Sequence, residues 1–518
     1  MDIEKVNELR QLAIQKMDAG DFKGALKLAY KMKSLGSHYL VSYTVSGLLI
    51  DIGSPGALQN EEIVKEGVEL LRKDFETIVH DERYAPTAYY NLANGYYVIF
   101  NFKTMRDPYV ACFKETELDQ AKIYYRKALE YDFKDAILMS QILVNLGNCF
   151  DHLGRVVEAL ECYREALKLK PDHGMALGNK GLALLHYAVL AGEHQGTFIA
   201  ESYSLLSQAL KIGVPPEAVS SFSKYLEDIG EHFPDKQILD SSPKYPGYTI
   251  KAKSKFERFL VQFCLENRLY LNICNFCQRC EAAIGDTAVI KKMIVPINKD
   301  SYLHLSGYLN QIKQDYVTAR FLLILSRYKG LSLDFVDKHV KIINTLDYSM
   351  HNIYIQLVKT SFKAFYDILD KIACFINGYL DLRIPERRID FRRLWYPNLE
   401  TKRVGKKIED TKNLSLNALF DLHRDFETGP YKKVKNIRHA LTHRFVNIRM
   451  LQEIEDEENM TEDTLVRQTL ELARIVRSAI IYMLHFVYVE ESKKEAKTKG
   501  ILTPMFAHDV PDKLKTTR

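Results

Sequence analysis

Residues 143–171, LVNLGNCFDHLGRVVEALECYREALKLKP, decide the fold of the first half of the chain. Small residues at Gly147 and Ala159 would let two antiparallel helices approach closely, and Tyr163 would fill the contact with the next helix. Pro171 would end the second helix, because proline lacks the backbone N–H that a helix interior requires. The stretch therefore predicts a helical hairpin that stacks on its neighbours.

The same spacing of small and bulky residues recurs along the first half. In 143–171 it resembles a tetratricopeptide repeat at Leu143, Leu146, Gly147, Phe150, Ala159, Tyr163, Ala166 and Pro171. Further units begin near Leu12, Leu92 and Leu177, and the segment 42–83 reads as helical but fits the pattern poorly. We expect about five helical pairs in a right-handed superhelix over residues 1–235, whose concave face binds a protein or peptide trigger.

The second half of the chain also reads as helical, so the predicted fold class is all-α. Prolines, glycine and serines at 240–247 interrupt the helical periodicity and place a linker at 236–250. Amphipathic segments follow at 255–271, 302–327, 352–382, 430–449 and 464–491. We divide this half into a helical lead-in at 251–345, a core at 346–491 and a basic flexible tail at 492–518.

Composition limits the class of protein. The chain has 518 residues, is 47% hydrophobic and carries a net charge of +5 from 72 basic and 67 acidic residues, which is too mild to argue nucleic-acid binding from totals. Eight cysteines and a charged start without a secretory leader favour free thiols in the cytoplasm. The most apolar run, 479–489, is about half the roughly 20 residues of a membrane-spanning helix, so we expect a buried helix and no membrane partner.

Five segments of the second half resemble, in chain order, the C-terminal domain of a bacterial HEPN branch that is commonly fused behind tetratricopeptide repeats. They are ENRLYLN at 266–272, YLNQIKQDYVTAR at 308–320, INTLDY at 343–348, FYDILDKIA at 365–373 and FRRLWY at 391–396. HEPN domains are four-helix-type modules that usually dimerise, and many are metal-independent ribonucleases of toxin and antiphage systems. The resemblance implies an RNA substrate, a homodimer or higher homo-oligomer, and no metal or cofactor.

The HEPN signature is an arginine, usually an asparagine-like residue, three further residues and a histidine. In YKKVKNIRHALTHRF at 431–445, Arg438 and His443 match its ends, while His439 stands where asparagine is usual. Some relatives carry a tyrosine two residues after the histidine that a partner nucleotidyltransferase modifies, but this chain has Phe445 there. The resemblance implies that Arg438 and His443 are the catalytic pair.

The chemistry of this pair suits RNA cleavage. Arginine binds phosphate through charge-assisted hydrogen bonds, and histidine can transfer a proton near neutral pH. Because one histidine cannot be acid and base at the same instant, we expect two copies of the chain to form one composite site. The auxiliary candidates are His439, Asn436 and Asp370. The residues expected to attract the RNA backbone are Lys432, Lys433, Lys435 and Arg444.

Simpler interpretations compete with several of these assignments. Arg438 and His443 could form a basic, solvated helix face, and Asp370 could pair with a neighbour such as Lys371 or Arg383. His439 and His443 have zinc-ligand spacing, but no third ligand is evident. The functional alternative is a non-catalytic repeat adaptor that dimerises and binds protein or RNA through its HEPN domain.

Three other features have less specific interpretations. Cys264, Cys274, Cys277 and Cys280 lack the spacing of a zinc ribbon or iron–sulfur site and are better explained as buried helical cysteines. Arg268 and Arg320 lie in HEPN-like segments, where they could contact phosphate. The acidic stretch 453–463 predicts a solvated loop that repels RNA.

Overall fold

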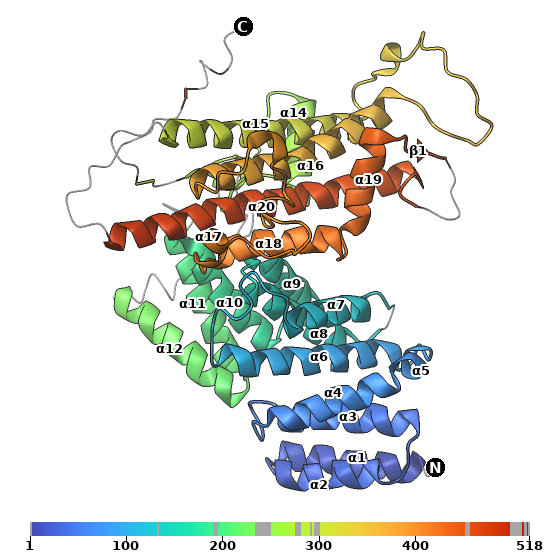
Figure 1. The fold of residues 1–518 in the computed structure, drawn as a ribbon, viewed down its shortest axis with the longest axis vertical. Helices are drawn as coiled ribbons and strands as arrows, with labels where there is room; N and C mark the ends of the chain where they lie inside the picture. Colours follow the sequence, from blue (N-terminus) through green and yellow to red (C-terminus); the bar gives the residue numbers. More distant parts are fainter. Residues whose placement is uncertain are drawn as a thin grey trace.

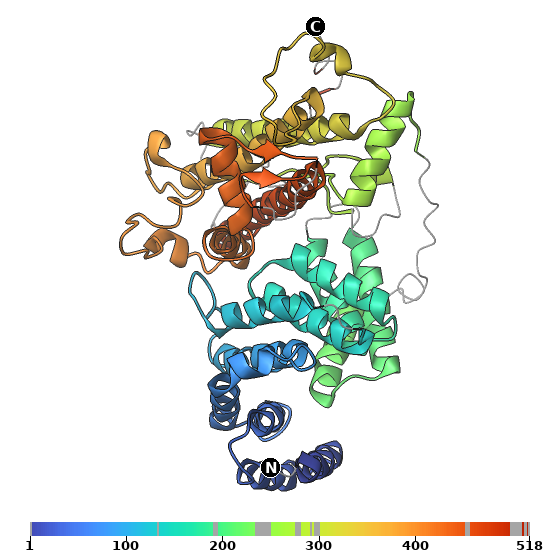
Figure 2. The ribbon, with the colours of Figure 1, turned by 90° about the vertical axis from the view of Figure 1, so that its right-hand side faces the viewer.

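The computed structural model describes residues 3–131, 134–189, 195–233, 250–274, 281–290, 293–294, 301–450, 456–497, 510–511 and 515. Over these ranges the protein is mostly helical, with one parallel pair of two-residue strands, β1 (Asn447–Ile448) and β2 (Asn459–Met460). The predicted all-α class is confirmed. A helical array and a helical bundle are stacked on each other, with the N-terminal helices farthest from the bundle (Figures 1 and 2).

The array consists of stacked helical hairpins. Its paired helices are α1 (Ile3–Asp18) and α2 (Phe22–Lys33), α3 (Tyr39–Gly53) and α4 (Glu61–Lys73), α6 (Ala85–Thr104) and α7 (Glu117–Leu129), α8 (Ala136–His152) and α9 (Val156–Leu169), and α10 (Gly174–Ala188) and α11 (Gln195–Ile212). The short helix α5 (Phe75–Val79) precedes α6, and α12 (Pro216–His232) follows the last pair. The segment 42–83, which fits the repeat pattern poorly, is therefore helical as expected.

Packing between α8 and α9 follows from the residues that mark the repeat. A Cβ atom on Gly147 would lie 2.5 Å from the ring of Tyr163, so only glycine allows this close approach. Ala159, Tyr163 and Ala166 are buried in the contact with neighbouring helices. Helix α9 ends at Leu169, two residues before Pro171.

The bundle is built from long helices. They are α14 (Lys255–Asn267), α15 (Ser301–Arg327), α16 (Ile353–Tyr379), α18 (Leu414–Glu427), α19 (Lys432–His443) and α20 (Glu462–Lys497). The short elements are α17 (Lys406–Glu409) and the 3-10 helices η3 (Glu281–Ile284), η4 (Asp334–Val336) and η5 (Glu386–Arg388). Helix α15, which falls within the lead-in of the sequence analysis, packs along α16.

Helix α20 is the central helix of the bundle. By length and composition it could cross a membrane, but 78% of its apolar window is buried inside the protein, as expected for the run at 479–489. The helix also extends into the tail that the sequence analysis began at 492. Lys493 and Lys494 form ion pairs with Glu490 and Glu491, at 2.8 and 2.5 Å, one helical turn apart, which supports helix through Lys497.

Other predicted boundaries fall outside the described ranges. The linker at 236–250 does so except for residue 250. Of the tail beyond Lys497, the structure describes residues 510–511 and 515.

The later part of the array, from Ala93 on, shares one hydrophobic core with the bundle, whereas the first helices form two separate clusters. The connection between α6 and α7, residues 105–116, is an insertion within one repeat, and it reaches the bundle. There the Phe113 ring packs 5.9 Å from that of Phe420, and the Phe113 N–H donates to Asn417 Oδ1 at 2.7 Å. On the α8–α9 turn, Gly154 has a φ of +79° and approaches α18 so closely that a Cβ atom would lie 2.1 Å from the carbonyl oxygen of Leu414. The repeat insertion is therefore a docking element for the bundle.

Candidate functional site

Helix α19 carries the predicted catalytic pair. Val434, Ile437 and Ala440 are buried at helical spacing and hold the helix against the bundle. The helix ends at His443, where the Arg444 N–H donates to the carbonyl of Ala440 at 2.9 Å. Residues five apart on a helix are separated by about 140° around its axis, so two of them point in different directions. Within the described residues, no hydrogen bond joins Arg438 to His443.

Arg438 is half-buried and its side chain packs against α16. Its Nη2 lies 3.4 Å from Asp367 Oδ1, and its guanidinium carbon lies 5.4 Å from the centre of the Tyr366 ring. Its Nε–H is buried without a hydrogen-bond partner in the described part of the chain. The carboxylate beside the candidate arginine is therefore Asp367, which the sequence analysis did not single out.

Asp370, the predicted auxiliary carboxylate, lies on α16 close enough to Arg438 for that cation to act on its pKa. It accepts a hydrogen bond from the backbone N–H of Phe391 at 2.9 Å, and burial raises the pKa of its carboxyl group. The alternative ion pairs do not form, because Lys371 pairs with Asp315 and Arg383 pairs with Asp381. Asp367 and Asp370 are one helical turn apart, and the side chain nearer Arg438 could not be chosen from spacing alone.

The two histidines of α19 lie together on the surface. His439 and His443 are both exposed, and their ring centres are 4.9 Å apart. Among the described residues, no group of three or more histidine, cysteine or carboxylate side chains could hold a metal ion. Cys264 and Cys274 are buried, whereas Cys277 and Cys280 lie outside the described ranges.

Carboxylates lie against the polar and basic face of α19. Asn436 Nδ2 donates to Glu457 Oε1 at 3.0 Å, and Arg444 forms an ion pair with Glu458 at 2.5 Å. With His439, Ala440 and Asp456, these residues line an open pocket of about 310 Å³. The part of the acidic stretch that the structure describes is thus no free solvated loop, because β2 pairs with β1 and holds this part beside α19.

The remaining basic candidates differ in their surroundings. Lys435 forms an ion pair with Glu427 at 2.6 Å. Lys432 is exposed and Lys433 is half-buried, and neither has an ion-pair partner among the residues that the structure describes. These two lysines are therefore the cations of the predicted set that remain available to an RNA backbone.

Arg268 and Arg320, the other candidates for phosphate contact, have structural partners. Arg320 is buried, donates to the carbonyl of Leu269 at 2.9 Å and pairs with Asp286 at 2.7 Å. Arg268 pairs with Glu161 of the array.

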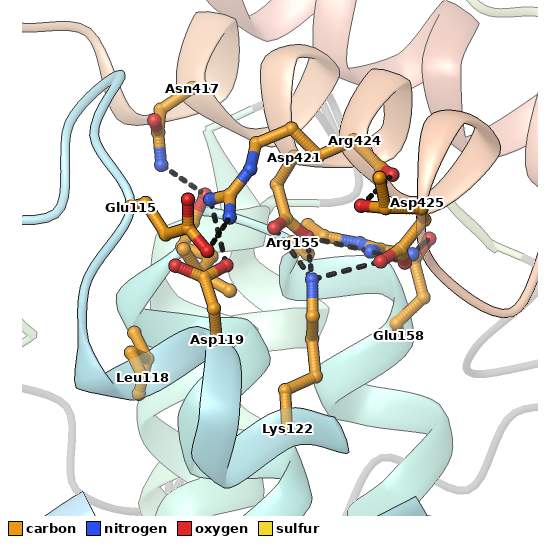
Figure 3. Close-up of polar contacts among 12 residues, drawn as sticks. Glu115, Leu118, Asp119, Lys122, Arg155, Glu158, Asn417, Asp421, Arg424 and Asp425 are labelled. Atoms are coloured by element: carbon orange, nitrogen blue, oxygen red, sulfur yellow. Dashed lines mark hydrogen bonds and ion pairs between the residues drawn. The ribbon is translucent and has the colours of Figure 1, made fainter. Parts of the chain in front are cut away.

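A buried network of charges fixes α18, the helix before α19, to the array (Figure 3). Lys122 Nζ lies 2.6 Å from Asp421 Oδ1 and 3.0 Å from Asp425 Oδ1. Arg155 Nη1 lies 2.7 and 2.6 Å from Oδ2 of the same two aspartates. These four side chains are at most 3% exposed.

Charge is balanced within the network. Its cations are Lys122, Arg126, Arg155 and Arg424, and its buried or half-buried carboxylates are Asp119, Glu158, Asp421 and Asp425, four of each sign; the exposed Glu115 also lies 3.8 Å from Arg424. Burial alone would raise the pKa of Asp425, but the neighbouring cations hold it well below its ordinary value. Removal of a single member should therefore leave an uncompensated buried charge and destabilise the protein.

The network also reaches the start of α19. Arg126 lies 3.2 Å from Asp425 and 5.9 Å from the centre of the Tyr431 ring. Tyr431, the residue before α19, donates its backbone N–H to the carbonyl of Asp425 at 3.0 Å. The array therefore helps to set the position of the helix that carries Arg438 and His443. Sequence reasoning missed these contacts because they join segments about 300 residues apart, and the local pattern gives no signal for them.

Family models match a segment in each half of the chain. The family described as LA2681-like HEPN matches residues 297–490, and tetratricopeptide repeats match residues 140–173 and 110–135. Two crystal structures of MamA are similar to this chain, both with a TM-score of 0.25. The first has 21% sequence identity and covers 40% of this chain and 92% of the MamA chain. The second has 23% sequence identity and covers 39% of this chain and 93% of the MamA chain. A search of curated proteins gives no match.

Proposed function

Because the chain joins tetratricopeptide repeats to an LA2681-like HEPN domain, we propose that it is a metal-independent endoribonuclease with Arg438 and His443 as its catalytic pair. The observation that supports this most is the placement of the HEPN-type arginine and histidine on one helix whose last residue, His443, is exposed to solvent. The repeats would bind a protein regulator, as expected of an effector in antiphage defence or a toxin system in the cytoplasm.

The proposed reaction needs no group beyond RNA and protein. The 2′-oxygen of a ribose attacks the adjacent phosphorus, the bond to the 5′-oxygen breaks, and the products carry a 2′,3′-cyclic phosphate and a 5′-hydroxyl. His443 takes the proton of the 2′-hydroxyl or supplies one to the leaving 5′-oxygen. Arg438 stabilises the negative charge that accumulates on the phosphate, in competition with Asp367, which lies 3.4 Å from its Nη2.

Two copies of the chain complete this site. One histidine cannot act as base and acid in the same step, so the second proton transfer needs another group. On this proposal the group is His443 of a second copy, placed across a twofold axis. Lys432 and Lys433 would bind the flanking phosphates, with affinity that falls as salt rises.

One observation favours the second candidate function, a non-catalytic adaptor. Arg438, Lys435 and Arg444 each have a carboxylate partner, which lowers the positive potential that an RNA substrate would meet. An adaptor would use the same bundle to dimerise and the repeats to bind protein.

Cleavage of RNA in EDTA separates the two functions. Arg438→Ala and His443→Ala should each abolish cleavage, whereas His80→Ala, which removes an exposed histidine of the array, should leave it unchanged. Wild-type products should carry 2′,3′-cyclic phosphate ends, and RNA with 2′-O-methyl groups should resist. Cleavage that survives in both α19 variants would refute the catalytic assignment, and binding of RNA without cleavage would favour the adaptor.

A further inference from the structure

The connection between α15 and α16 forms an exposed arm, residues 329–350. It reaches away from the bundle next to α19 and β1 (Figure 1). Large apolar side chains are exposed along it, including Phe335, Val340, Ile342, Ile343, Leu346 and Tyr348. The last three expose 87%, 85% and 80% of their surface. Single exposed apolar residues are ordinary, but a run of them marks a surface that another molecule covers.

The base of the arm is anchored beside the candidate catalytic helix. The Met350 N–H donates to the carbonyl of Ile448 at 2.7 Å, and the Met450 N–H donates to that of Tyr348 at 3.2 Å. Leu346 and Tyr348 have φ values of +59° and +58°, a left-handed conformation that bulky residues rarely adopt. The backbone is thus held in an unfavourable form that keeps both side chains outside the chain's own core.

The apolar surface continues from the arm to the end of α19. Phe445 and Met450 are 73% and 66% exposed, and they lie in the short segment between His443 and the anchored base of the arm. A molecule that covers the arm and these two residues would therefore be placed next to His443.

The charge of the arm favours a second copy of the chain as that molecule. The arm has three lysines, Lys329, Lys338 and Lys341, and three aspartates, Asp334, Asp337 and Asp347, so its lysines and aspartates cancel (3 − 3 = 0). An RNA-binding arm would be basic. A neutral arm with both signs can pair with its own twofold copy, lysine to aspartate, through Asp334 and Asp337, because Asp347 already lies 3.7 Å from Arg449 of the same chain.

The size of the arm fits a dimer interface as well. Residues 329–350 are 22 residues (350 − 329 + 1), comparable with the roughly 20–30 residues that each partner contributes to a stable interface. We propose that the arm, with Phe445 and Met450, is the surface through which two copies of this chain dimerise. The inference builds on the proposed function, in which a second copy completes the site at His443.

Sedimentation of the full chain tests the arm. Wild type should be a dimer in the micromolar range, and the double variant Ile343→Asp/Leu346→Asp should raise the dissociation constant at least about 100-fold, because two exposed apolar contacts per copy become buried charges. Met105→Asp/Ile137→Asp, which alters two exposed apolar residues of the array, is the matched control and should remain dimeric. All four positions are exposed, so the fold should persist, as circular dichroism would verify.

The outcomes distinguish this inference from the proposed function. A wild-type monomer, or an arm variant that dimerises as tightly as the control, overturns the inference whatever the nuclease assay gives. An arm variant that is monomeric supports it, even if no form of the protein cuts RNA. His443→Ala should stay dimeric. If it is dimeric and does not cleave RNA, its defect is in catalysis and not in dimerisation.

Discussion

Removal of one cation from the buried network should destabilise the whole protein, and Lys122→Met is the sharpest such change. Methionine keeps the volume of the aliphatic stem but removes the ammonium group that lies 2.6 Å from Asp421 and 3.0 Å from Asp425. The buried and half-buried part of the network would then hold three cations against four carboxylates. Breaking a buried ion pair in this way costs about 3–5 kcal/mol, a large part of the roughly 5–15 kcal/mol that stabilises a folded domain.

Urea denaturation followed by circular dichroism measures this cost. Lys168→Met is the matched control, because Lys168 pairs with Glu165 at 2.9 Å on the surface of the same array and its side chain is 62% exposed. Such an exposed pair contributes about 0–1 kcal/mol. The second change Asp421→Asn should recover much of the loss in Lys122→Met, because it restores the balance of charge. Equal destabilisation by the two lysine variants would refute the reasoning.

The remaining predictions concern the acidic stretch, the repeat and pH. The double variant Glu457→Gln/Glu458→Gln should bind RNA about tenfold more tightly at low salt, because two negative charges are removed beside the polar face of α19. The control Glu130→Gln, on the array, should leave RNA affinity unchanged. Fluorescence anisotropy measures the affinity of each variant. Gly147→Ala should lower stability by about 1–3 kcal/mol in thermal melts, because its Cβ would lie 2.5 Å from a ring of α9. The pKa of Asp425 is lower in the folded protein than in the unfolded chain. The contribution of Asp425 to stability is therefore present above its unfolded pKa and is lost as pH falls through its folded pKa. The melting temperature of wild type, measured over an acid pH series, should fall accordingly, and a melting temperature that does not fall would contradict the lowered pKa.

Local patterns allowed much of the fold to be predicted. The spacing from Leu143 to Pro171 identified a repeat because each of its small and bulky residues serves a contact with a neighbouring helix. The predicted amphipathic segment 430–449 contains α19, which ends earlier, at His443. The chain's tail was harder, because ion pairs one turn apart extend α20 through a segment whose composition favours disorder.

The partners of the candidate site could not be predicted from such patterns. Asp367 lies 71 residues before Arg438, and Lys122 lies 299 residues before Asp421, so no periodicity connects either pair. The insertion between α6 and α7 interrupted the repeat for no reason visible in the sequence, yet Phe113 packs there against the bundle. Contacts of this kind depend on how the two halves dock, which local propensity does not specify.

The docking of the two halves limits how a regulator on the array could act. A flexible tether would let the bundle move freely, but here the later part of the array shares a core with the bundle, and Arg126 contacts both Asp425 and Tyr431 at the start of α19. A protein bound to the repeats can therefore favour one state of the proposed site only by interacting differently with two arrangements of α7 against α18. On the proposed function, a regulator that activates cleavage would bind better to the arrangement in which Arg438 and the polar face of α19 are open to phosphate, against the competing carboxylates of Asp367, Glu457 and Glu458.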